Sequence, residues 1–78
     1  MKCLANFIAE MHIEIDRADR KHGNWDNLSN IEAAEKILDE VKEVHEAALA
    51  DDIHSDHGLL RESVQTAVTA FKMYRKNY

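Results

Sequence analysis

Three stretches of this 78-residue chain repeat apolar residues at intervals of three and four, and this spacing limits the fold more than any other feature. Such intervals place apolar side chains on one face of an α-helix. The stretches cover about residues 4–21, 30–50 and 58–77, and short polar segments separate them. The sequence therefore predicts one all-α domain over residues 1–78, in which three main helices form a helical bundle.

The polar segments carry signals for helix ends. Gly23 follows three basic residues, which suits a helix C-terminus because glycine stops a helix and cations stabilise the negative end of its dipole. Ser29 and Glu32 have the spacing of a capping box, which predicts where the second helix begins. Before the third helix, we expect Ser55 or Asp56 to act as the N-cap.

The size of the chain predicts a partner. A protein of 78 residues buries only about 60 % of the surface that its unfolded chain exposes, so its own core is marginal. Residues 63–71 of the third helix contain no charge, and such a helix is expected to be contacted on more than one side. We therefore expect oligomerisation to complete the bundle, most simply through a second copy of the chain.

Composition restricts the other partners and the compartment. The formal charge of −5, from 15 acidic and 10 basic residues, argues against general affinity for nucleic acid or anionic membranes. No apolar run approaches the roughly 20 residues that span a bilayer. Because Cys3 is the only cysteine and no secretory segment is evident, we expect a cytoplasmic protein.

The second predicted helix carries acidic residues beside its apolar face. On a helical projection, Glu40 lies at the margin of that face and Glu43 lies one step further out. From this helix alone, a charged solvent face balanced by Lys36 and Lys42 is the favoured interpretation. The apolar face itself consists of Ile31, Ala34, Ile37, Leu38, Val41, Val44, Ala48 and Leu49.

The third predicted helix changes this interpretation. Glu62 enters its uncharged region, where an ionised carboxylate is costly unless it is paired or bound to a cation. A metal ion shared with Glu40 and Glu43 would supply the cation. A salt bridge from Glu62 to Arg61 or another base is the alternative.

Two polar segments can be interpreted either as ligand-binding or as purely structural. Trp25, beside Arg20 and Lys21, can stack on a nucleobase while the cations bind phosphate, and it fits equally well as a residue that closes the end of the bundle. His54 and His57 accompany three aspartates, and imidazole and carboxylate suit transition metals. Their spacing matches no zinc signature, so we expect a capped loop there.

Several motifs, in this order, resemble a known family over roughly residues 10–76. They are a first helix that ends in Lys-His-Gly, a tryptophan loop, Glu-x-x-Glu at residues 40–43, a short turn, and Arg-Glu-Ser-Val-Gln-Thr-Ala-Val-Thr-Ala. The chain resembles the MazG-like, all-α nucleotide pyrophosphohydrolases, including their short phage-type members.

The resemblance implies a Mg²⁺-dependent hydrolase, with Mn²⁺ as an alternative ion, that cleaves a nucleoside triphosphate to the monophosphate and pyrophosphate. The family's metal motif, Glu-x-x-Glu followed by Glu-x-x-Asp, carries over onto Glu40, Glu43 and Glu62, with Gln65 in place of the aspartate. A glutamine carbonyl can ligate Mg²⁺ but brings no negative charge, so weaker metal binding or fewer ions are expected. Bound Mg²⁺ lowers the pKa of the attacking water, and Glu43 is the candidate base.

The resemblance also implies a homodimer or homotetramer with the substrate between helices. Lys21, Trp25, Lys72 and Lys76 are then the candidate substrate-binding residues. The cations near the end of the third helix have a simpler interpretation as partners of the helix dipole. Because Gln65 departs from the motif, a second function remains open, namely a non-catalytic helical oligomerisation or regulatory module with an impaired metal site.

Overall fold

A computed structural model describes all 78 residues and contains three α-helices and no strand: α1 (Lys2–His22), α2 (Asn30–Leu49) and α3 (Leu59–Asn77). The predicted all-α fold with three helices is confirmed, and every helix boundary lies within two residues of its predicted position. No helix combines the length and the apolar character that crossing a membrane requires.

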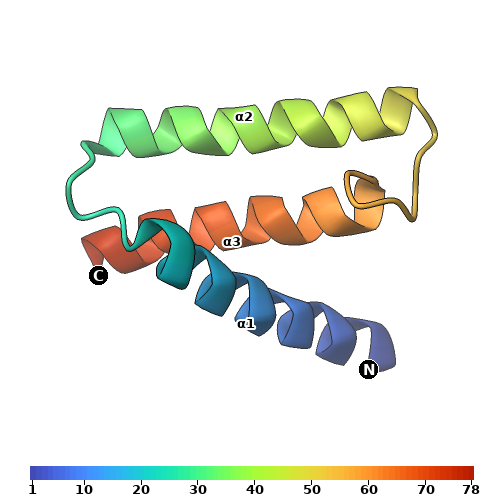
Figure 1. Ribbon diagram of the computed structural model, residues 1–78, viewed down its shortest axis with the longest axis horizontal. Coiled ribbons are helices and arrows are strands. Elements are labelled where there is room, and N and C mark those ends of the chain that lie inside the picture. Colours follow the sequence, from blue (N-terminus) through green and yellow to red (C-terminus); the bar gives the residue numbers. More distant parts are fainter.

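The helices form an open arrangement around α3. Helices α2 and α3 run antiparallel along each other, and α1 extends obliquely from the end of α3 that carries the C-terminus (Figure 1). Helix α3 contacts both other helices, whereas α1 and α2 do not contact each other. Helix α3 is therefore contacted on more than one side, as expected, but by helices of its own chain, and the contact with a second copy stays a prediction.

Local signals account for the ends of α1 and α2. Gly23 follows α1 with a φ of 70°, and its N–H donates to the carbonyl of Asp19. At α2, the Ser29 side chain accepts a hydrogen bond from the Glu32 N–H at 3.1 Å, and the Glu32 carboxylate accepts one from the Ser29 N–H at 2.9 Å. The predicted capping box is confirmed.

The start of α3 differs from the prediction. The N-cap is Gly58, and no side chain caps the helix, so the expected Ser55 or Asp56 cap is wrong. Ser55 instead bonds through its N–H and its hydroxyl to the carboxylate of Asp52. A Cβ on Gly58 would lie 2.8 Å from the carbonyl carbon and oxygen of Ile53, so the chain needs glycine there.

The face of α2 that packs on α3 is rotated from the predicted one. Its buried residues are Ala33 and Ala47, with Ile37 and Val44 partly buried. Six residues of the predicted face are exposed instead, namely Ile31, Ala34, Leu38, Val41, Ala48 and Leu49. The small alanines allow α2 and α3 to approach closely, and the carboxylate of Glu40 lies on this inner face, not at its margin.

Candidate metal centre

Three carboxylates converge between α2 and α3. Glu40 and Glu43 of α2 and Glu62 of α3 each offer one oxygen atom, and these atoms lie within 4.8 Å of one another. The i, i+3 spacing of the α2 pair directs both side chains to one side of that helix, and the antiparallel α3 brings Glu62 opposite them. The structure thus brings together three of the four predicted metal ligands.

Two oxygen atoms of this cluster are buried without a hydrogen-bond partner. They are the Oε2 atoms of Glu40 and Glu62, and Glu62 as a whole is only 2 % exposed. The other oxygen of Glu62 lies 3.5 Å from Nδ1 of His57, whose side chain is almost fully exposed. Since a buried acceptor without a partner costs about 1–3 kcal/mol, and more when it is charged, these oxygens have the character of unsatisfied ligands.

The same crowding perturbs the ionisation of the cluster. Burial raises the pKa of Glu40 to about 7, and the neighbouring charges of Glu43 and Glu62 act in the same direction. Burial also raises the pKa of Glu62, reinforced by Glu43 and opposed by His57. Near neutral pH the cluster therefore either keeps a proton or favours a bound cation.

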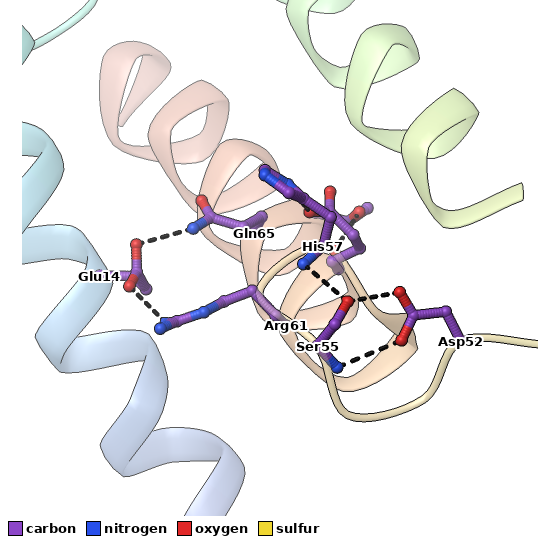
Figure 2. Close-up of polar contacts among 8 residues, drawn as sticks. Glu14, Asp52, Ser55, His57, Arg61 and Gln65 are labelled. Carbon is purple, nitrogen blue, oxygen red and sulfur yellow. Dashed lines mark hydrogen bonds and ion pairs between the residues drawn. The ribbon is translucent and has the colours of Figure 1, made fainter. Parts of the chain in front are cut away.

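The fourth predicted ligand makes a contact that the sequence analysis missed. Nε2 of Gln65 donates a 2.8 Å hydrogen bond to Oε2 of Glu14 on α1 (Figure 2). Glu14 also accepts from Nη1 of Arg61 at 2.6 Å and lies 3.3 Å from Arg17. The available signal was periodicity, because Glu14 stands seven residues after Phe7 and therefore on the apolar side of α1.

The candidate substrate-binding residues divide into two groups. Trp25 and Lys72 are 8 % and 6 % exposed, and Nζ of Lys72 lies 5.4 Å from the centre of the Trp25 ring. Burial lowers the pKa of Lys72. Lys76 lines an adjoining hollow with both residues, whereas Lys21 lies in a separate depression beside Arg20 and does not reach them.

Two clefts border the acidic cluster on different sides. A cleft of about 620 Å³ contains Trp25 and Lys72 together with Glu40, Glu43 and Gln65. The other, of about 410 Å³, shares those three residues and is otherwise lined by Arg17, Asp56, His57, Arg61 and Glu62. Both volumes lie in the range of small-molecule sites, which is roughly 300–1,000 Å³. The cluster thus separates an aromatic and lysine-bearing cleft from an arginine-bearing one.

Comparison of the chain with protein-family models, with curated proteins and with solved structures finds no match. The converging donor atoms of the acidic cluster are carboxylate oxygens, which are hard ligands of the kind that Mg²⁺ and Mn²⁺ prefer.

Proposed function

We propose that this chain is a Mg²⁺-dependent nucleoside triphosphate pyrophosphohydrolase, which converts a ribo- or deoxyribonucleoside triphosphate to the monophosphate and pyrophosphate. The observation that carries the proposal is the convergence of Glu40, Glu43 and Glu62, with a buried oxygen of two of them lacking any partner. A divalent cation would satisfy these oxygens and offset the repulsion among the three carboxylates.

The residues of the chain divide the chemistry among them. A bound metal ion would neutralise phosphate charge and would lower the pKa of a water molecule that it binds. Glu43 is the most exposed carboxylate of the cluster and borders both clefts, so it is the group that accepts the proton from the attacking water. Glu40 and Glu62, which are more buried, act as the fixed ligands.

The cleft of about 620 Å³ is the proposed nucleotide site. Trp25 and Lys72 are the groups that we propose for the base and the phosphates, and they would have to separate on binding, because Nζ of Lys72 now lies over the Trp25 ring, 5.4 Å from its centre. Lys76 adds positive charge at the adjoining hollow. Lys21 has no part in this arrangement, because it faces a different depression.

The proposal includes a homodimer or homotetramer. The outer face of α2 exposes a stripe of apolar side chains, and α1 and α2 do not cover each other. A second copy of the chain would bury such a stripe and complete the bundle. The stripe, which we name the α2 outer stripe, consists of Ile31, Leu38, Val41 and Leu49.

Incubation of the purified chain with a panel of nucleoside triphosphates and Mg²⁺ or Mn²⁺ tests the function. We expect equal release of monophosphate and pyrophosphate, reduced by more than roughly 100-fold in Glu40→Ala, because that variant lacks a metal ligand. Glu35→Ala, an exposed change on the same helix, is the matched control. Activity that survives Glu40→Ala would show that the metal centre lies elsewhere.

One observation favours a second candidate, the non-catalytic oligomerisation or regulatory module. Gln65 adds no charge to the cluster, and its amide nitrogen is engaged with Glu14. A chain that forms its oligomer but hydrolyses none of the nucleotides, with either metal, would support this candidate against the enzyme.

A further inference from the structure

We infer that the arginine-bearing cleft of about 410 Å³ is the site for the pyrophosphate part of the substrate, held by the guanidinium groups of Arg17 and Arg61. The inference rests on the proposed function and adds to it, since Lys72 lines the other cleft. It assigns a ligand class, a metal-bound pyrophosphate, to the cleft that the base does not occupy.

The two arginines share one buried carboxylate. Nη1 of Arg61 on α3 donates a 2.6 Å hydrogen bond to Oε1 of Glu14 on α1 (Figure 2), and Nη1 of Arg17 lies 3.3 Å from the same oxygen. Glu14 is 3 % exposed and so anchors both side chains at the wall of the cleft. Because one carboxylate carries a single negative charge, the two guanidinium groups keep one positive charge in excess.

Most donors of both guanidinium groups remain free. A guanidinium group has five N–H donors, and each of these two contacts Glu14 through Nη1 alone. The side chains of Arg17 and Arg61 are 60 % and 31 % exposed, so their other donors are accessible from the cleft that both residues line. Such planar, forked donors match the oxygen atoms of a phosphate group.

The acidic cluster lies where the two clefts meet. Glu40 and Glu43 line both clefts, whereas Lys72 lines only the larger of the two and the arginines line only the smaller. The proposed reaction cleaves the bond between the α- and β-phosphates, so this bond has to lie at the carboxylates. A nucleotide whose base occupies the larger cleft then extends its β- and γ-phosphates into the smaller one.

Anion binding in this cleft depends on the metal ion. The arginines face four acidic residues of the cleft lining, namely Glu40, Glu43, Asp56 and Glu62. A divalent cation offsets two of these charges and accepts phosphate oxygens as ligands. We therefore expect pyrophosphate to bind in the presence of Mg²⁺ and not in its absence.

Calorimetric titration with inorganic pyrophosphate at saturating Mg²⁺ tests the inference. Arg17→Gln removes one guanidinium group, and Arg61→Lys removes the fork but keeps a cation for the buried Glu14. We expect each variant to bind pyrophosphate about tenfold more weakly, because each loses charge-assisted hydrogen bonds. Mn²⁺ affinity without pyrophosphate should stay within about twofold of the original, since neither arginine is a ligand of the ion.

Lys42→Gln is the matched control. It removes one positive charge from an exposed position of α2 that lines neither cleft. Both affinities should stay within about twofold, because an exposed charge at such a place interacts weakly. A loss of pyrophosphate affinity as large as that of Arg17→Gln would be a general effect of net charge and would overturn the inference.

Lys72→Gln distinguishes the two clefts. If pyrophosphate lay in the larger cleft, this variant would lose pyrophosphate affinity while Arg17→Gln kept it, and that result overturns the inference. An equal loss of Mn²⁺ affinity and pyrophosphate affinity in the arginine variants also overturns it, because the arginines would then act through the metal centre.

Failure of the inference can be distinguished from failure of the enzyme. Weaker pyrophosphate binding by Arg17→Gln and Arg61→Lys, in a chain that hydrolyses no nucleotide, contradicts the proposed function only. Nucleotide hydrolysis by a chain whose pyrophosphate affinity changes in neither variant overturns the inference only. Absence of Mg²⁺-dependent pyrophosphate binding by the unaltered chain also overturns the inference, and the hydrolysis assay with Glu40→Ala still judges the enzyme.

Discussion

Glu62 combines nearly complete burial with an oxygen that has no hydrogen-bond partner. Burial is the main cause of its raised pKa, and the charge of Glu43 adds to it. Without a cation, a charge on Glu62 is poorly solvated by water. It also faces two further carboxylates, which repel it. Metal binding therefore favours an ionised carboxylate at residue 62, whereas the stability of the metal-free fold favours a neutral side chain there.

Glu62→Gln should stabilise the metal-free chain and abolish the stabilisation by Mn²⁺. The amide removes one of three like charges, for which we expect a gain of roughly 1 kcal/mol, or about 4–8 °C in melting temperature for a domain of this size. Circular dichroism melting with and without Mn²⁺ measures both effects. Glu35→Gln, at an exposed site, should change neither, and a variant that melts lower but keeps the Mn²⁺ shift would contradict the argument.

The raised pKa of Glu40 predicts how stability depends on pH. Its carboxyl has a pKa of about 7 in the folded chain against 4.5 as its ordinary value, so folding strengthens proton binding. The contribution of this group is complete below its unfolded pKa and is lost as the pH rises through about 7.

Metal replaces the proton at the same group. Stabilisation by Mn²⁺ should therefore increase from about pH 5 to about pH 8, because at low pH the ion competes with protons. Urea unfolding with and without Mn²⁺ across that range measures the effect. Glu40→Gln should remove most of the pH dependence, and a Mn²⁺ effect that is equal at all pH values would speak against this cluster.

At the level of the elements, the turn between α2 and α3 sets the position of Glu62. The N–H groups of Leu59 and Leu60 donate to the carbonyls of Asp52 and Ile53, at 2.8 and 3.3 Å, and so fix the first turn of α3. Gly58 lies in the middle of this contact, with no room for a Cβ against the backbone of Ile53.

Gly58→Ala should destabilise the fold by about 1–3 kcal/mol, the usual range for an added methyl group in a tightly packed place. The first turn of α3 would have to move, and Glu62 would move with it, so Mn²⁺ affinity should fall as well. Urea unfolding and calorimetry measure the two effects. Ser63→Ala, at an exposed position of the same helix, is the control; a Gly58→Ala variant as stable as this control would mean that the turn adapts.

The sequence predicts each helix well because capping boxes, glycine stops and periodicity are local signals. It predicts the rotation of α2 poorly, since the apolar arc of that helix is wide and either half could face α3. Ile31 and Leu49 dominate any projection, yet packing uses Ala33 and Ala47, whose small size allows the close approach that the carboxylates need.

The same distinction holds for the candidate site. Residue spacing predicts that Glu40 and Glu43 share one side of a helix, whereas Glu62 stands on another helix and meets them only through the packing of α2 on α3. The contact of Glu14 with Gln65 joins residues 51 positions apart in different helices. No spacing rule encodes such a contact, and only the packing of α1 on α3 reveals it.

At the level of the whole molecule, the open arrangement predicts association. The α2 outer stripe remains exposed in the single chain, whose mass is 9.0 kDa. We expect sedimentation velocity to show a dimer or tetramer. Replacing Leu38 and Val41 by glutamine should shift the population toward the monomer, whereas replacing the exposed Lys42 and Glu46 by glutamine should not. A monomeric unaltered chain at micromolar concentration would contradict the expectation.

The attachment of α1 to a single neighbour has a consequence for amide hydrogen exchange. The helix is tied to α3 at its middle by Glu14 and near its end by Asp19, while Leu4 and Ile8 near its start are exposed. Its amides should therefore exchange along a gradient, fastest near the N-terminus. Those around Glu14 and Asp19 lie where α1 is attached to α3, so they should be the slowest of the helix.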